Sequence, residues 1–115
     1  MKRLLLFGGV LLLAACCGCG HRNRVKAPET LLSDRQMIDV MTDVYLIEAM
    51  LTQKKQQGTM SSGLAADYYR QLYEHYGLTA HDLEENMDYY SRQPALLESI
   101  MDSVAKRLEQ ASPPR

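Results

Sequence analysis

The sequence predicts an all-α protein, a small irregular bundle of about four helices that follows a signal peptide and a flexible tether. Three observations predict this architecture. Apolar side chains recur every three or four residues in four separate stretches after residue 33. Each stretch is bounded by a helix-capping residue, a glycine or a proline. The first 15 residues have instead the composition of a secretory signal peptide.

The amino-terminal segment has a positive region, an apolar region and small residues before a cysteine. Lys2 and Arg3 supply the charge, and the apolar run after them is shorter than the roughly 20 residues that span a bilayer. The tetrapeptide LAAC at 13–16 resembles the lipobox of bacterial lipoproteins. In that pattern the cysteine thiol receives a diacylglyceryl group, and the peptidase cuts just before the cysteine. We therefore expect residues 1–15 to be removed and Cys16 to become the lipidated first residue.

Other interpretations of this segment stay open. It is also compatible with an ordinary signal peptide cut after Ala15, or with a short uncleaved anchor. Lipid on Cys17 or Cys19 is a further alternative, although the tripeptides before them fit the lipobox less well. The three cysteines with His21 also resemble metal ligands, but the lipobox already accounts for Cys16. We therefore expect no metal and no other cofactor.

Residues 16–28 are predicted to be a lipidated tether. Its basic side chains either lie on anionic headgroups or are simply solvated; they are His21, Arg22, Arg24 and Lys26. In similar surface-exposed lipoproteins an acidic run after the cysteine acts as an export signal, and this chain has none there. We therefore expect a lipid anchor in the outer membrane, with the domain on the periplasmic face. Loss of Lys2 and Arg3 leaves 11 basic against 14 acidic residues, and this net charge of −3 argues against nucleic acid as a partner.

Residues 29–110 are predicted to form the helical domain. Its first helix begins near Ser33, which forms a capping box with Gln36, and extends to about Lys55, before Gly58. Its apolar stripe consists of Met37, Val40, Met41, Val44, Ile47 and Leu51. The second helix is expected over 62–76, with Tyr73 outside a stripe of Ala65, Tyr68, Tyr69, Leu72 and Tyr76.

The third helix is predicted over 80–91, after a capping box of Thr79 and Asp82. Leu83, Met87 and Tyr90 are expected to face the core, with Asn86 at the edge. The fourth helix begins at Pro94, which suits a first turn, and extends to about Glu109. Its stripe consists of Leu96, Leu97, Ile100, Met101, Val104 and Leu108, and 111–115 are expected to be a disordered tail. The first helix should lie in the groove between the fourth helix and the hairpin of the second and third.

A single carboxylate interrupts the first apolar stripe. At 100° per residue Glu48 projects close to Val44, where a charge is costly unless it is paired. Asp39 and Asp43 lie on one flank, four residues apart, a spacing that is repulsive in isolation. One interpretation is that Glu48 is a functional carboxylate with a perturbed pKa. The other, which we favour, is that a tyrosine hydroxyl or an arginine of a facing helix satisfies its charge. The candidate ligand or buried polar cluster is Asp43, Glu48, Tyr68 and Tyr90.

Several segments resemble one protein family. They are PETLL at 28–32, MIDVMTDVYLIEA at 37–49, YEHYGL at 73–78, MDYY at 87–90 and the run 94–108. Together they resemble the small lipoproteins of the Bacteroidota that contain domain of unknown function 4296. The resemblance covers nearly all of the chain after the signal peptide. It implies a location and a fold, but no activity and no catalytic residues.

No catalytic motif is present in the sequence: there is neither a phosphate-binding glycine loop nor a nucleophile elbow. His75 and His81 lack the i, i+4 spacing of helical metal ligands. The seven tyrosines suggest an aromatic binding platform, but tyrosine at helical spacing is more often part of a core. We therefore expect no enzyme, but a lipid-anchored interaction module that binds another envelope protein. The alternative is a small-ligand-binding lipoprotein that uses Glu48 and nearby tyrosines.

Overall fold

The computed structural model describes residues 25–112, which form four helices and no strand. The helices are α1 (Asp34–Gln56), α2 (Leu64–Tyr76), α3 (Ala80–Ser91) and α4 (Pro94–Ala111). The predicted all-α bundle is therefore confirmed. The predictions for the signal peptide, Cys16, Cys17, Cys19 and His21 concern positions outside the described residues.

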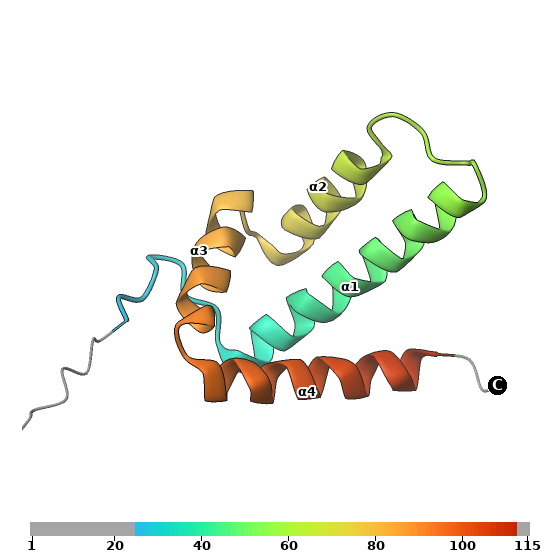
Figure 1. Cartoon of the computed structure of the whole chain (residues 1–115). Helices are drawn as coiled ribbons and strands as arrows, with labels where there is room; N and C mark the ends of the chain where they lie inside the picture. Colours follow the sequence, from blue (N-terminus) through green and yellow to red (C-terminus); the bar gives the residue numbers. More distant parts are fainter. Residues whose placement is uncertain (1–24, 113–115) are drawn as a thin grey trace, which may run out of the picture.

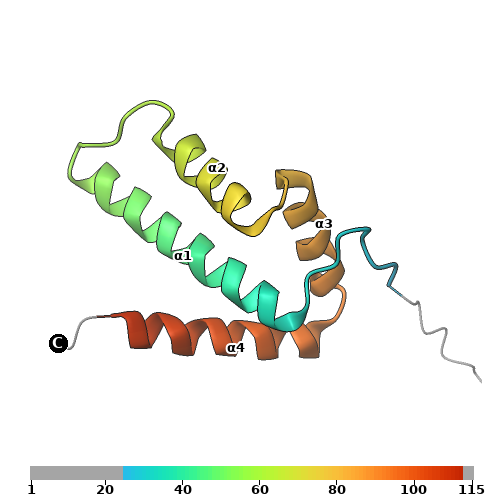
Figure 2. The same ribbon diagram turned by 180° about the vertical axis from the view of Figure 1, so that it is seen from behind.

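The longest helix, α1, lies between the other elements (Figures 1 and 2). α2 returns antiparallel along its carboxyl-terminal half, and α4 packs against its amino-terminal half on the other side. α3 links the ends of α2 and α4 and lies beside the extended segment that enters α1. α1 and α4 separate toward the carboxyl end of α1, so that this half of α1 has only α2 as a neighbour.

Local sequence explains where the helices begin and end. Ser33 with Gln36, and Thr79 with Asp82, form the two predicted capping boxes. The hydrogen bond from the Thr79 backbone N–H is the main reason why the pKa of Asp82 lies below its usual value. α2 begins at Leu64 rather than at residue 62, because Gly63 has φ 84°, a left-handed conformation that a helix does not continue through.

The core consists of two clusters that share α1. The larger surrounds the amino-terminal half of α1 and contains Leu32, Met37, Val40, Met41, Leu78, Tyr90, Ile100 and Val104. The smaller joins α1 to α2 through Ile47, Leu51 and Leu72. Tyr73 packs against both clusters, so its predicted place outside the α2 stripe is wrong.

The predicted orientation of α3 is also wrong at two neighbouring positions. Asn86 is 0% exposed, whereas Met87 is 37% exposed. The reason is that α3 packs against a polar partner: the backbone of residues 30–32 lies on it and bonds to the Asn86 amide. An apolar pattern does not reveal a neighbour of this kind, because the contact satisfies backbone groups as well as burying side chains.

Candidate functional site

The four residues predicted to form a ligand or polar cluster do not come together. Asp43 and Tyr68 line a groove between α1 and α2. Tyr90 lies in the larger core cluster and is 2% exposed. Glu48 lies in neither the groove nor the core cluster. Its carboxylate accepts a hydrogen bond from the Tyr69 hydroxyl on the exterior of the α1–α2 pair.

The expectation that Glu48 is enclosed in the apolar stripe is wrong, since its side chain is exposed. The helical wheel places Glu48 close to Val44, but the core cluster at this level of α1, around Ile47 and Leu51, includes side chains of α2 and none of α4. A hydroxyl from a facing helix does satisfy it, as in the favoured alternative. Burial, reinforced by the Glu48 carboxylate, raises the pKa of Tyr69 to about 12.

The two aspartates on one flank of α1 bond to side chains of α4 and α2. Asp39 pairs with Arg107 of α4, and Asp43 accepts a hydrogen bond of 2.6 Å from the Tyr76 hydroxyl of α2. Burial, with the nearby Asp43 carboxylate, places the pKa of Tyr76 well above its ordinary value. The repulsive spacing of the two aspartates is therefore tolerated because each has a partner on a different element. The sequence did not identify these partners, which lie 68 and 33 residues away.

Tyr76→Phe should lower the free energy of unfolding by about 1–2 kcal/mol, because a hydrogen bond to a carboxylate contributes more than a neutral one. Tyr45→Phe is the matched control, since Tyr45 is also in the α1–α2 pair but is 42% exposed. Urea unfolding of both variants measures the difference. In a double-mutant cycle with Asp43→Ala, strictly additive losses would contradict a direct bond between Tyr76 and Asp43.

A shallow apolar groove of about 520 Å³ lies between α1 and α2. Its lining is Leu46, Ile47 and Met50 from α1, Tyr68 and Leu72 from α2, and the polar Asp43, Gln71 and His75. Leu46 is 39% and Met50 40% exposed. These two residues were not predicted to form a surface, although their i, i+4 spacing outside the main stripe is the signal for a second apolar face. We call this surface the α1–α2 groove.

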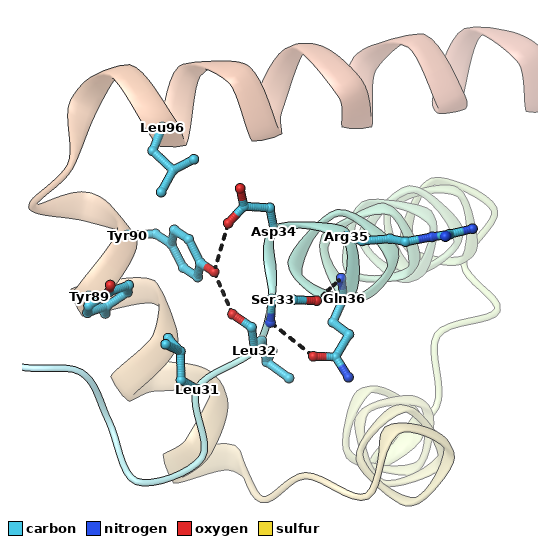
Figure 3. Close-up of a pocket in the computed structure, with 9 residues that line it drawn as sticks. All are labelled: Leu31, Leu32, Ser33, Asp34, Arg35, Gln36, Tyr89, Tyr90 and Leu96. Atoms are coloured by element: carbon cyan, nitrogen blue, oxygen red, sulfur yellow. Dashed lines mark hydrogen bonds between the residues drawn. The ribbon is translucent and has the colours of Figure 1, made fainter.

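A second groove, of about 560 Å³, lies where the chain enters α1 (Figure 3). Leu31, Tyr89 and Leu96 supply its apolar walls, and Asp34 and Arg35 lie at the start of α1. The Tyr90 hydroxyl donates a hydrogen bond to the Leu32 carbonyl and a longer one, 3.3 Å, to Asp34. Burial, with the Asp34 charge, raises the pKa of Tyr90 to about 12.

The best-satisfied polar site binds backbone of the same chain. We call residues 30–32 the strap. The Leu32 N–H donates to Asn86 Oδ1 at 2.8 Å, and Asn86 Nδ2 donates to the Thr30 carbonyl at 2.7 Å and to the Asp82 carbonyl at 2.8 Å. The one amide therefore binds an N–H and a carbonyl of an extended segment while it stays joined to its own helix.

Neither a metal site nor a membrane span is found in the described part of the chain. Among residues 25–112, no three side chains of His, Cys, Asp or Glu gather closely enough to hold a metal ion. No helix there combines the length and the hydropathy needed to cross a membrane. The α1–α2 groove contains His75 and Asp43, but no serine, threonine or cysteine. The groove at the start of α1 contains Ser33 and Asp34, and the Ser33 hydroxyl accepts a hydrogen bond from the Gln36 N–H as a helix cap.

The sequence matches, over residues 28–113, the family described as "Domain of unknown function (DUF4296)". This confirms that the chain belongs to the domain family inferred from the sequence. No curated protein and no solved structure matches the chain. The matched region contains all four helices and the strap, so the family corresponds to the helical domain as a whole.

Proposed function

We propose that this chain, which belongs to the DUF4296 family, is a lipid-anchored, non-catalytic interaction module of the bacterial cell envelope. Lipid on Cys16 would hold the helical domain at the outer membrane, on its periplasmic face. The α1–α2 groove would bind an apolar surface of another envelope protein. The lipobox-like tetrapeptide at 13–16 supports the anchor, and the exposure of the groove supports the contact.

The α1–α2 groove is the observation that carries the interaction. A contiguous apolar patch on the surface of a protein often marks a binding site, whereas single exposed apolar residues are common and need no explanation. Leu46 and Met50 lie one turn apart on α1 and face a groove whose floor is apolar. Their side chains contribute little to the two core clusters, which do not contain them. Their apolar character is therefore better explained by a partner than by folding.

The distribution of charge favours a protein partner over the lipid surface. All 14 acidic residues of the chain lie in residues 25–112, together with only eight of its 13 basic residues, which leaves a formal charge of −6 there. Such a body is repelled by anionic headgroups, which attract basic segments instead. A second copy would carry the same charge, so we expect a different protein that presents an apolar helix face flanked by Lys or Arg.

The alternative function, binding of a small ligand at Glu48, has less support. Glu48 is paired with Tyr69 and lines neither of the two grooves. Of the four candidate residues, only Asp43 and Tyr68 share a surface, and Asp43 is already bonded to Tyr76. Tyr90 is buried in the core and bonded to the strap, so it is not free to contact a ligand.

Metabolic labelling tests the anchor. Radiolabelled palmitate should appear in the wild-type chain and be absent from Cys16→Ser, because the thiol is the lipidated group. Cys17→Ser and Cys19→Ser are the controls and should keep the label. Label that persists in Cys16→Ser would assign the lipid to another residue, and a wild-type chain without any label would refute the anchor.

Site-directed photo-cross-linking in intact envelopes tests the contact. A photoreactive residue at Gln71, which lines the groove and is exposed, should give one discrete adduct. Leu46→Glu should abolish the adduct, whereas Met60→Glu, at a methionine 41% exposed outside the groove, should leave it intact. Both changes are at exposed positions and should preserve the fold. Equal melting temperatures of the two variants and the wild type would show this. An adduct that survives Leu46→Glu would place the contact elsewhere.

A further inference from the structure

The two core clusters differ in how completely they are buried. The larger cluster contains side chains with almost no exposed surface, such as Val40 at 0% and Ile100 at 1%. The smaller cluster, between α1 and α2, has three buried members that each keep 5–8% of their surface exposed, namely Ile47, Leu51 and Leu72. Most of the stability of a helix in a protein comes from the packing of its apolar face. The smaller cluster therefore holds its two helices less firmly than the larger cluster holds α1 and α4.

α2 has few other contacts to hold it. Leu72 is its one buried side chain, and the helix packs chiefly against α1. It has 13 residues, about the length at which an isolated helix is marginal in water. It follows Gly63, which provides no side-chain cap, whereas α1 and α3 begin with capping boxes. The bond from Tyr69 to Glu48 also joins α2 to α1, but it is exposed, so water replaces both partners if the helices separate.

The weakly held part of the molecule has a defined boundary. Up to Leu72, the side chains of α2 that reach a core cluster reach only the smaller one. Beyond Leu72, Tyr73 and Tyr76 also pack against the larger cluster, and the Tyr76 hydroxyl bonds to Asp43. We call residues 47–72 the tip. It consists of the end of α1, the connecting loop and most of α2, and it lies at the end of the molecule away from α3 (Figures 1 and 2).

We propose that the tip opens and closes as a unit of its own while the larger cluster stays folded, and that the α1–α2 groove exists only while the tip is closed. Segments held by few buried apolar contacts open at a lower free energy than the whole domain. Most of the groove is built from the tip, including Ile47, Met50, Tyr68 and Leu72. A partner in the groove therefore binds the closed state and keeps the tip closed. This linkage to a partner rests on the proposed function, whereas the opening itself does not.

Native-state hydrogen exchange on the purified protein tests the opening. In urea concentrations below the global transition, the Leu51 and Leu72 amides of the tip should exchange through an opening of lower free energy than the Val40 and Val104 amides. The free energy of that opening should also depend less steeply on urea, because less surface is exposed. Equal free energies and equal urea slopes at all four amides would refute a separate opening.

Two chemically identical substitutions show which part stays folded. Ile100→Val removes one methyl group from the larger cluster, and Ile47→Val removes one from the smaller. Ile100→Val should speed exchange at Val104 roughly fivefold and leave the rate at Leu72 unchanged, because Ile100 keeps its contacts when only the tip opens. Ile47→Val should speed exchange at both amides, since the tip is also open in the unfolded state. Equal acceleration at Leu72 and Val104 in Ile100→Val would mean that the tip opens only with the whole domain.

The cross-link formed from Gln71 in intact envelopes tests the linkage to a partner. Leu51→Ala weakens the smaller cluster without changing a side chain that lines the groove. It should lower the adduct yield about twofold or more, because the apparent affinity falls with the closed fraction. Val104→Ala truncates a residue of the larger cluster and should leave the yield unchanged.

The outcomes separate the opening from the proposed function. An adduct undiminished in Leu51→Ala, or equally diminished in Val104→Ala, would refute the linkage between the tip and the partner. A wild-type chain that forms no adduct would refute the proposed function, while hydrogen exchange still decides whether the tip opens on its own.

Discussion

Asn86→Ala is expected to lower the free energy of unfolding by about 2–5 kcal/mol, a large share of the stability of a small domain. The change leaves the buried Leu32 N–H and the part-buried Thr30 carbonyl without their partner. An unsatisfied buried group costs about 1–3 kcal/mol, and the cavity left by the fully buried Asn86 side chain adds to the loss. The higher helix propensity of alanine offsets only a few tenths of this loss. Urea unfolding followed by far-UV circular dichroism measures the difference.

Met87→Ala is the control for this prediction. It truncates the adjacent side chain of the same helix at a position that is 37% exposed, so the expected loss is within about 0.5 kcal/mol. A simple apolar reading of α3 predicts the opposite order, with Met87 in the core and Asn86 at the edge. If Met87→Ala proved the more damaging change, the observed orientation of α3 would be refuted.

Ile100→Ala should cost about 2–5 kcal/mol for a different reason, the loss of apolar packing. Ile100 is 1% exposed and lies in the larger core cluster, where α4 meets α1. Truncation removes favourable burial and leaves a cavity that its neighbours fill only in part. Thermal and urea unfolding of the variant should both show the loss.

Leu46→Ala tests whether Leu46 serves the folding core or the binding surface. Leu46 is also a large aliphatic residue of the bundle, but it is 39% exposed in the α1–α2 groove. We expect it to change stability by less than about 1 kcal/mol while it weakens the cross-link formed from Gln71. A stability loss as large as that of Ile100→Ala would mean that the groove is part of the folding core, and the argument for a partner there would fail.

The partners of the charged and tyrosine side chains were not predicted from the sequence. The spacing of Asp39 and Asp43 showed an acidic flank, but not that Arg107 and Tyr76 would neutralise or bond it. The helical wheel placed Glu48 near Val44, yet its exposure depended on which side chains of other helices reach this part of α1. Such facts are set by packing between segments far apart in the chain, which the periodicity of a single helix does not contain.

The amino-acid sequence alone determined the helical class, the ends of α1, α3 and α4 to within about two residues, and the family. These features depend on local chemistry: capping boxes at Ser33 and Thr79, a glycine at 77 and a proline at 94 act within a few residues of themselves. Only the tertiary structure decided that Asn86 is buried and binds the strap, that Glu48 faces water, and that Leu46 and Met50 line a groove. The physical reason is that burial is a property of the neighbour as much as of the residue, and each neighbour here comes from another part of the chain.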